Sequence, residues 1–397
     1  MKLTKLFTDF FESGKSSGII LIFCTTLSLL LANSSFGSSY LGMWHHDLFG
    51  SPVEFWINDG LMTVFFLLVG LEIEREVYIG ELSSFQNALL PVCGALGGML
   101  VPAGIHLAFN YGTPTQAGAG IPMATDIAFS LGILSLLGSR VPASLKVFLT
   151  ALAIIDDLGS ILVIALFYSK DFSWSYFGLA MLVFAILLAM NRLKVHTIPF
   201  YLLLGGVMWV FMLRSGIHPT ITGILLAFAI PFGNGDERSP SYGLQHWLHK
   251  PVAYLILPLF ALANTGVLIS AGWASGLLVP NSLGIGLGLL LGKPLGIVLF
   301  SMLGVGLGFY ALPKDISLNQ LIGAGLLAGI GFTMSIFITL LGFSDSSLIA
   351  ESKIAILTAS VLAGLSGFIV LKLTLRQPSG SDEEPLAVPS SLIDGKG

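Results

Sequence analysis

The sequence predicts an all-α polytopic membrane protein with about twelve transmembrane helices. Hydrophobic residues make up 54% of the 397 residues and charged residues only 10%, and the mean hydropathy is +0.89. Apolar runs of about 20 residues, the length that crosses a bilayer as a helix, recur along nearly the whole chain. Short segments with Gly, Pro and charged residues separate these runs.

The spans are expected to form one transmembrane domain, residues 1–376. The first run is expected to be an uncleaved signal-anchor. Residues 377–397 are rich in Ser, Pro and acidic residues, so they are predicted to be a disordered cytoplasmic tail. The intervals 35–55 and 233–249 are long enough for small elements. The expected spans lie near residues 18–34, 56–72, 88–109, 118–138, 144–168, 174–190, 197–213, 217–232, 250–270, 282–308, 319–343 and 351–373.

Basic residues predict the orientation. With the N-terminus inside, Lys170, Arg214 and Lys353 are the basic residues of the outer side, and Lys293 lies within a span. This asymmetry places both termini in the cytoplasm. The basic residues on the cytoplasmic side are then Lys2, Lys5, Lys15, Arg75, Arg140, Lys146, Arg192, Lys194, Arg238, Lys250, Lys314, Lys372, Arg376 and Lys396.

Composition also excludes several functions. The formal net charge is −4 and no basic patch is evident, so no nucleic-acid partner is expected. Cys24 and Cys93 both fall in apolar runs, where a thiol behaves as a small hydrophobe. The sequence therefore predicts neither a disulfide nor a cysteine metal site.

The run ALAIIDDLGSILVIALFY, residues 151–168, places Asp156 and Asp157 near the middle of a span. An ionised aspartate at the centre of the bilayer costs about 2.5–3.5 kcal/mol, so the pair opposes insertion of the helix. The presence of both acids therefore indicates a functional role. A buried helix of a soluble protein is the structural alternative, but nearly every other segment is also apolar enough to span. We therefore expect the two carboxylates to face a polar cavity and to bind protons or a cation.

Lys293 stands deep in the run LGIGLGLLLGKPLGIVLF and needs a partner of opposite charge. Asp156 and Asp157 are the candidates. Adjacent residues of a helix point about 100° apart, so the two aspartates cannot do the same job. One is expected to meet Lys293 and the other to line the cavity.

Two apolar segments are interrupted in similar ways, which suggests an internal repeat. GIPMATDIAFSLGILSLLG carries Pro122, Thr125 and Asp126 at its centre, and GLLAGIGFTMSIFITLLGF carries Gly329, Gly331 and Thr333 at the matching depth. Interrupted helices in corresponding places of two halves indicate a transporter binding site. Packing of small residues is the alternative for the glycines, but Asp126 beside the break favours function.

This chemistry predicts antiport. Buried carboxylates can hold protons or a small hard cation such as Na⁺ or Li⁺, and both compete for the same oxygens. With alternating access, such competition exchanges one for the other, and Thr125 could add a hydroxyl ligand. No cofactor and no enzymatic activity are expected. An intramembrane aspartyl protease using Asp126 and Asp156, and a cation channel, are the alternatives.

Other ionisable residues lie at the ends of predicted spans. The acidic cluster after the second span is either a solvated helix end or a funnel for cations. Asp59 is expected to be a helix N-cap. Three histidines at helix ends either cap them or sense pH. The cluster comprises Glu72, Glu74, Arg75, Glu76 and Glu81, and the histidines are His218, His246 and His249.

The chain resembles the bacterial NhaA family of sodium/proton antiporters from residue 18 to about 375. The motifs that carry the resemblance are PMATDIAFSLG, ALAIIDDLG, LLVGLEIERE, VAYLILPLFALAN, LLGKPLG and GIGFTMSIFI. The resemblance implies an inner (plasma) membrane protein of a bacterium, with twelve helices in inverted repeats. It also implies that the fourth and eleventh helices are unwound and cross near the midplane.

The resemblance implies roles for individual residues. Asp157 is similar to the essential carboxylate that binds cation and proton, and Asp156 to its partner, bridged to Lys293. Thr125 and Asp126 match the polar positions at the first break. Members exchange external protons for internal Na⁺ or Li⁺, moving more protons than cations, and are activated at alkaline pH. The positions that resemble the pH-response cluster are Glu72, Arg75, Glu76, His218, His246 and His249.

Three departures from the family pattern stand out. Glu74 replaces a basic residue, which would make the cytoplasmic mouth more negative. Gln245 replaces a glutamate of the pH-response cluster, which would shift the pH profile. The loop 35–55 is shorter than in members that dimerise through a β-hairpin there, so the resemblance implies a homodimer only where this shorter loop keeps that contact.

Overall fold

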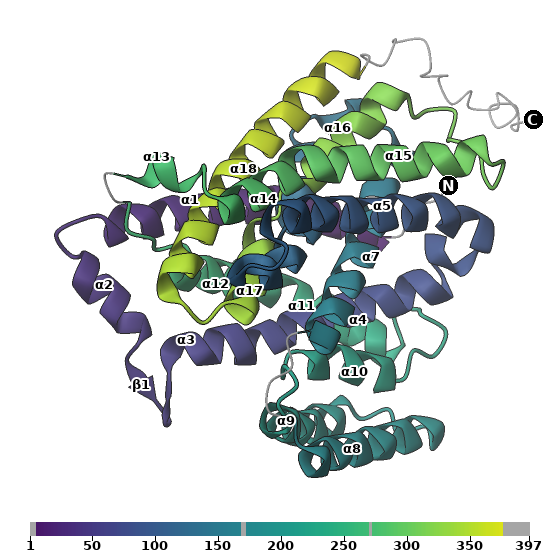
Figure 1. The fold of residues 1–397 in the computed structure, drawn as a ribbon. Coiled ribbons are helices and arrows are strands. Elements are labelled where there is room, and N and C mark those ends of the chain that lie inside the picture. The colour runs from purple at the N-terminus through teal and green to yellow at the C-terminus, as the bar shows by residue number, and fades with distance from the viewer. Residues whose placement is uncertain (1–4, 168–171, 270–271, 376–397) are drawn as a thin grey trace, which may run out of the picture.

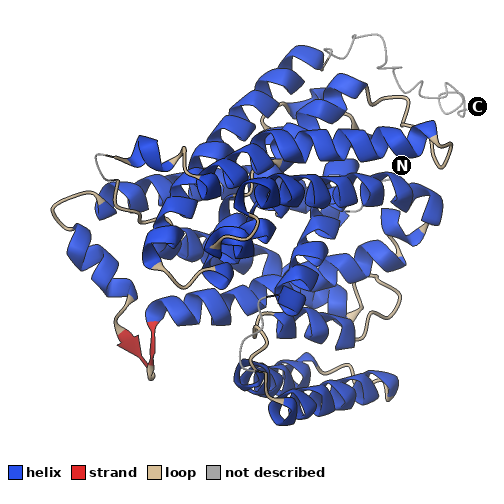
Figure 2. Ribbon diagram, in the orientation of Figure 1, coloured by secondary structure: helices blue, strands red, loops and turns tan. Residues whose placement is uncertain are grey.

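The computed structural model describes residues 5–167, 172–269 and 272–375, which form a bundle of helices with one small β-hairpin (Figures 1 and 2). Six helices of this part are long and apolar enough to cross a membrane, or up to eight if each bent pair counts as one span. The all-α, multi-pass fold predicted from composition is therefore confirmed. The predicted tail, residues 377–397, lies outside the described residues.

The first third of the described chain runs from α1 to α5. The predicted loop 35–55 contains both a short helix and the hairpin, whose strands pair antiparallel as Asp47 with Pro52 and Leu48 with Ser51. Phe49 and Gly50 form its turn with positive φ angles of 55° and 84°. The elements are α1 (Lys5–Ala32), α2 (Gly37–Trp44), β1 (Asp47–Leu48), β2 (Ser51–Pro52), α3 (Val53–Phe55), η1 (Trp56–Leu61), α4 (Met62–Tyr78), η2 (Glu81–Ser83) and α5 (Phe85–Asn110).

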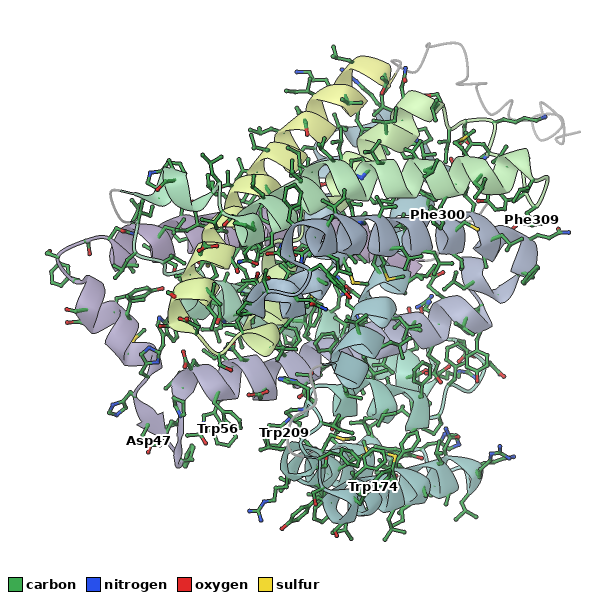
Figure 3. The ribbon with its side chains drawn as sticks, viewed as in Figure 1. Asp47, Trp56, Trp174, Trp209, Phe300 and Phe309 are labelled. Atoms are coloured by element: carbon green, nitrogen blue, oxygen red, sulfur yellow. The ribbon has the colours of Figure 1, made fainter. Side chains whose placement is uncertain are left out.

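The middle of the chain contains the first interrupted segment and the helix with the paired aspartates. Helices α8 and α9 lie side by side at the edge of the molecule, next to α10 (Figure 1). Figure 3 shows Trp209 of α9 near Trp56 of η1, and their rings stack with centroids 6.3 Å apart. The elements are η3 (Pro114–Met123), α6 (Ile127–Ser135), η4 (Gly138–Arg140), α7 (Ala143–Phe167), α8 (Trp174–Arg192), α9 (Ile198–Ser215) and α10 (Ile221–Ala229).

The last part contains the lysine helix and the second interrupted segment. Around the span expected at 250–270, the helical segment begins at Pro240 and ends at Asn264, because α11, η5 and α12 follow one another without a break. The elements are α11 (Pro240–Pro251), η5 (Val252–Ile256), α12 (Leu257–Asn264), α13 (Trp273–Gly276), α14 (Pro280–Leu287), η6 (Gly288–Gly292), α15 (Lys293–Gly306), α16 (Leu318–Ala328), α17 (Phe332–Gly342) and α18 (Ser346–Thr374).

Helices α5 and α15 lie side by side and pack backbone against backbone (Figure 1). A Cβ atom on Gly97 would lie only 2.1 Å from the carbonyl oxygen of Gly296. Small residues allow helices in lipid to approach this closely, where dispersion rather than exclusion of water holds them together. This contact fixes the position of the helix that carries Lys293.

Both predicted interruptions are present. The first segment passes from η3 through extended residues 124–126 into α6, and the second bends by 47° between α16 and α17. The two breaks lie against each other, because the backbone N–H of Asp126 donates to the carbonyl of Ile330 at 2.7 Å. Irregular backbone at membrane depth is tolerated where protein satisfies its polar groups.

Candidate functional site

The buried charges meet where α7 faces the first residue of α15. Lys293 and Asp156 are both fully buried, and Lys293 Nζ lies 2.5 Å from Asp156 Oδ2. The lysine also donates to the carbonyl of Met123, the last residue of η3. Of the two candidate partners, the structure therefore pairs Lys293 with Asp156. The π-helical segment η6 ends immediately before this lysine, and such segments are frequent at functional sites.

Asp157 is buried beside this pair but is not part of it. Its side chain is 1% exposed, and its Oδ1 has no hydrogen-bond partner among the residues that the structure describes. Asp156 Oδ1 likewise has no partner within that part of the chain. Burying a carboxylate oxygen without a partner is costly, so the site has unused capacity for a proton or a cation.

The hydroxyl of Thr125 connects the aspartates to both breaks. Its Oγ1 lies 2.8 Å from Asp156 Oδ2 and 2.9 Å from the carbonyl oxygen of Ala328 at the end of α16. A hydroxyl carries one proton, so Thr125 can donate to only one of these acceptors at a time. A change in the charge of Asp156 can therefore alter the hydrogen bond between Thr125 and Ala328, which lies at the second break.

Asp126 holds the two breaks together. Its carboxylate accepts from the backbone N–H of Phe129 at 2.9 Å and of Thr333 at 3.1 Å, and from the hydroxyl of Thr333. It thus lies at the N-termini of both α6 and α17, where helix dipoles favour a negative charge. Its oxygens are thus committed to donors from both breaks. The sequence placed Thr333 at the matching depth but gave no sign of this contact.

Part of the predicted pH-response cluster is brought together where α4 and α11 pack against each other. Glu72 and His249 line one small cavity of about 40 Å³, together with Ile127 and Ala128, which directly follow Asp126. The neighbouring Arg75 and His246 are linked through the ring of Tyr242 on α11. The guanidinium carbon lies 5.4 Å from the centroid of that ring, and the His246 ring stacks on it at 6.4 Å. Glu76, the next residue after Arg75 on α4, is half-buried.

His218 does not belong to this group. Its Nε2 lies 3.2 Å from Asp59 Oδ1 and its Nδ1 2.9 Å from the hydroxyl of Thr220. The expectation that Asp59 caps a helix is wrong, because η1 joins α3 and α4 into one continuous helical segment with Asp59 inside it. A side chain in the interior of a helix has no free N–H groups to cap, so its carboxylate contacts a neighbouring segment instead.

The expected effect of Glu74 on the cytoplasmic mouth is also corrected. Its side chain is only 4% exposed, and its Oε2 has no hydrogen-bond partner in the described ranges. It lies one turn from Gly70, which packs against Ile224 and Ala227 of α10. Helical periodicity therefore turns Glu74 toward α10, whereas the sequence alone left a solvated helix end and a funnel for cations as the alternatives.

Comparison with known proteins agrees with these features. The sequence matches the family model "Na+/H+ antiporter 1" over residues 8–371, a range that contains every site residue above. The chain belongs to this antiporter family. The family assignment made from the motifs is thereby confirmed.

Three relatives named "Na(+)/H(+) antiporter NhaA" illustrate the similarity. The protein of Flavobacterium psychrophilum is 60% identical over 376 residues, covering 95% of this chain and 98% of the relative. That of Cytophaga hutchinsonii is 58% identical over 382 residues, covering 96% and 99%. That of Dechloromonas aromatica is 60% identical over 374 residues, covering 93% and 96%. The similarity therefore extends over almost the full length of both chains in each comparison.

Proposed function

We propose that this protein is an electrogenic Na⁺(Li⁺)/H⁺ antiporter of the bacterial inner membrane, with both termini in the cytoplasm. The supporting observation is the unpaired Oδ1 of Asp157, buried beside an Asp156 that is already bridged to Lys293. Carboxylate oxygens are hard ligands that suit an alkali ion or a proton, and the two cannot occupy the same oxygen together. Binding one therefore expels the other.

Alternating access would turn this competition into exchange. The two interrupted segments touch at Asp126 and Ile330, and we propose that they are corresponding parts of two inverted repeats that cross near the midplane. Their broken ends contact Asp126, Thr125 and Lys293, so a movement of either break would change the surroundings of both aspartates. Three ionisable groups facing one monovalent cation allow more than one proton to move per Na⁺.

An imposed pH gradient in everted vesicles tests the function directly. Na⁺ and Li⁺ should collapse the gradient with wild-type protein, and Asp157→Asn should abolish this response. Asp47→Asn is the matched control, because Asp47 is exposed on the hairpin (Figure 3). Full exchange by Asp157→Asn would refute the assignment of the site. Reversal potentials in proteoliposomes would test electrogenicity, because electroneutral exchange would not respond to voltage.

We further propose activation at alkaline pH through the cavity shared by Glu72 and His249. This cavity reaches Ile127 and Ala128, next to Asp126, so a charge change at its cytoplasmic side can bias the first break. Glu72→Gln should move the pH of half-maximal exchange, and the same shift is not expected from Asp47→Asn. An unchanged pH profile for Glu72→Gln would exclude this residue from the response.

A homodimer through the hairpin β1–β2 is also proposed. The hairpin stands at the edge of the molecule, and Leu48 and Phe49 are exposed. Exposed strand edges pair readily with a second copy. Phe49→Cys should form a disulfide-linked dimer in membranes under mild oxidation, whereas recovery of monomer alone would argue against this contact.

A further inference from the structure

Ser160 lies on the face of α7 that carries the two aspartates. At 100° per residue, it stands about 40° beyond Asp156 and about 60° before Asp157, one turn further along the helix. Side chains in a helix lean toward its N-terminus, so the hydroxyl of Ser160 is directed back toward the two carboxylates. Ser160 is 1% exposed, so it is as deeply buried as they are.

The hydroxyl of Ser160 has no hydrogen-bond partner among the described residues. This is unusual, because a serine or threonine inside a helix commonly donates to the carbonyl three or four residues earlier. Thr150 of the same helix does so, with Oγ1 2.9 Å from the carbonyl oxygen of Lys146. The geometry of α7 therefore permits such a bond, and Ser160 does not make it.

Three buried oxygens without partners thus share one face of α7: Asp156 Oδ1, Asp157 Oδ1 and Ser160 Oγ. The other oxygen of Asp156 is already occupied by Lys293 and Thr125. Unsatisfied polar atoms that cluster in a protein interior indicate a bound group that completes their bonding. Two carboxylate oxygens and one hydroxyl form a donor set for a hard cation.

We infer that the Ser160 hydroxyl is a further ligand of the transported alkali cation, beside the two aspartates. This inference rests on the proposed function. It has a specific consequence, because a serine hydroxyl does not titrate, whereas a carboxylate binds both proton and cation. Ser160 therefore strengthens the binding of Na⁺ or Li⁺ without offering a second place for the competing proton.

Equilibrium binding to the purified protein in detergent tests this inference. Ser160→Ala should weaken Na⁺ binding by about ten- to a hundredfold, the usual size of one lost interaction with a charged group. Proton binding measured without Na⁺ should stay as in wild type. Ser160→Cys has nearly the same volume but a soft ligand, so it should weaken Na⁺ binding to a similar degree. Apparent KM values for Na⁺ in vesicles should rise in parallel.

Ser301→Ala is the matched control. Its hydroxyl is also fully buried and without a partner in the described part, but it lies two turns beyond Lys293 and faces Gly94. This variant should bind Na⁺ as wild type does. The inference would be overturned if Ser160→Ala bound Na⁺ with an affinity within twofold of wild type. It would also be overturned if both Ser160 variants failed to fold, because the hydroxyl would then have a structural role. Failure of the proposed function has a different signature, since wild type would then show no exchange and Asp157→Asn would bind Na⁺ normally.

Discussion

Removing the charge of Lys293 should destabilise the protein strongly. Lys293→Met roughly keeps the length of the side chain but leaves Asp156 buried with Thr125 as its remaining side-chain partner among the described residues. Breaking a fully buried ion pair by removing one partner costs about 3–5 kcal/mol. The unfolding entropy of a protein is about 2.1 cal/mol/K per residue, so 1 kcal/mol shifts the Tm of a 397-residue chain by about 1.2 °C. We therefore expect Tm to fall by about 4–6 °C.

A double-mutant cycle separates the charge from the packing. Asp156→Asn alone leaves the lysine without its counter-charge, whereas Asp156→Asn with Lys293→Met removes both charges. The double variant should regain at least half of the Tm that Lys293→Met loses, because no unpaired buried charge remains. Thermal unfolding of the purified protein, followed by intrinsic fluorescence, measures these differences. Lys250→Met is the control, since Lys250 is exposed, and its Tm should stay within about 1 °C.

Two results would refute this reasoning. One is an unchanged Tm for Lys293→Met. The other is a fall in the Tm of the double variant that equals the sum of the falls for the two single variants.

Transport adds a separate question about the same residue. If Lys293 only stabilises Asp156, the reversal potential of Lys293→Met should match wild type. If the lysine carries a transported proton, the charge moved per cation should fall.

Three further outcomes are expected. Gly97→Ala should lower Tm markedly, because its Cβ would lie 2.1 Å from the Gly296 carbonyl oxygen, whereas Gly104→Ala meets nothing within 4 Å and should not lower it. Equal Tm values would contradict the close packing of α5 and α15. Asn281→Ala should cost about 1–3 kcal/mol in unfolding experiments, because it leaves the buried His106 Nε2 without its partner at 3.4 Å. Finally, equilibrium titrations should show Na⁺ affinity weakening as pH falls, by up to about tenfold per unit for each proton displaced, and a Na⁺ affinity independent of pH would exclude competition.

Local sequence was sufficient for the features that depend on composition and spacing. The acids at membrane depth could be recognised as functional without a structure, because transferring an ionised carboxylate into lipid costs free energy that no contact within its own helix offsets. The same reasoning required a partner for Lys293 and assigned different roles to Asp156 and Asp157, since neighbouring helical residues cannot point the same way. The interruptions at Thr125–Asp126 and at Gly329–Gly331 followed from small and polar residues within apolar runs.

Other features depended on contacts between segments far apart in the chain. The choice of Asp156 for Lys293 requires α7 and α15 to be placed relative to each other. The capping of two helices by Asp126 requires Thr333, more than 200 residues away. Asp59 was misjudged as a helix N-cap because the sequence did not show that the helix begins before it, at Val53. Glu74 was misjudged because an acidic residue near the end of an apolar run looks solvated until the neighbouring helices are known.

The sequence by itself determined that this chain is a multi-pass helical membrane protein of the antiporter family, with acids and one lysine that lipid alone would not tolerate. Only the tertiary structure decided which oxygens of the site are occupied and which have no partner among the described residues, namely Asp156 Oδ1, Asp157 Oδ1 and Ser160 Oγ. The physical reason is that transfer into lipid is a property of each segment separately. Pairing of buried polar atoms is a property of distances between segments, and no local pattern encodes those distances.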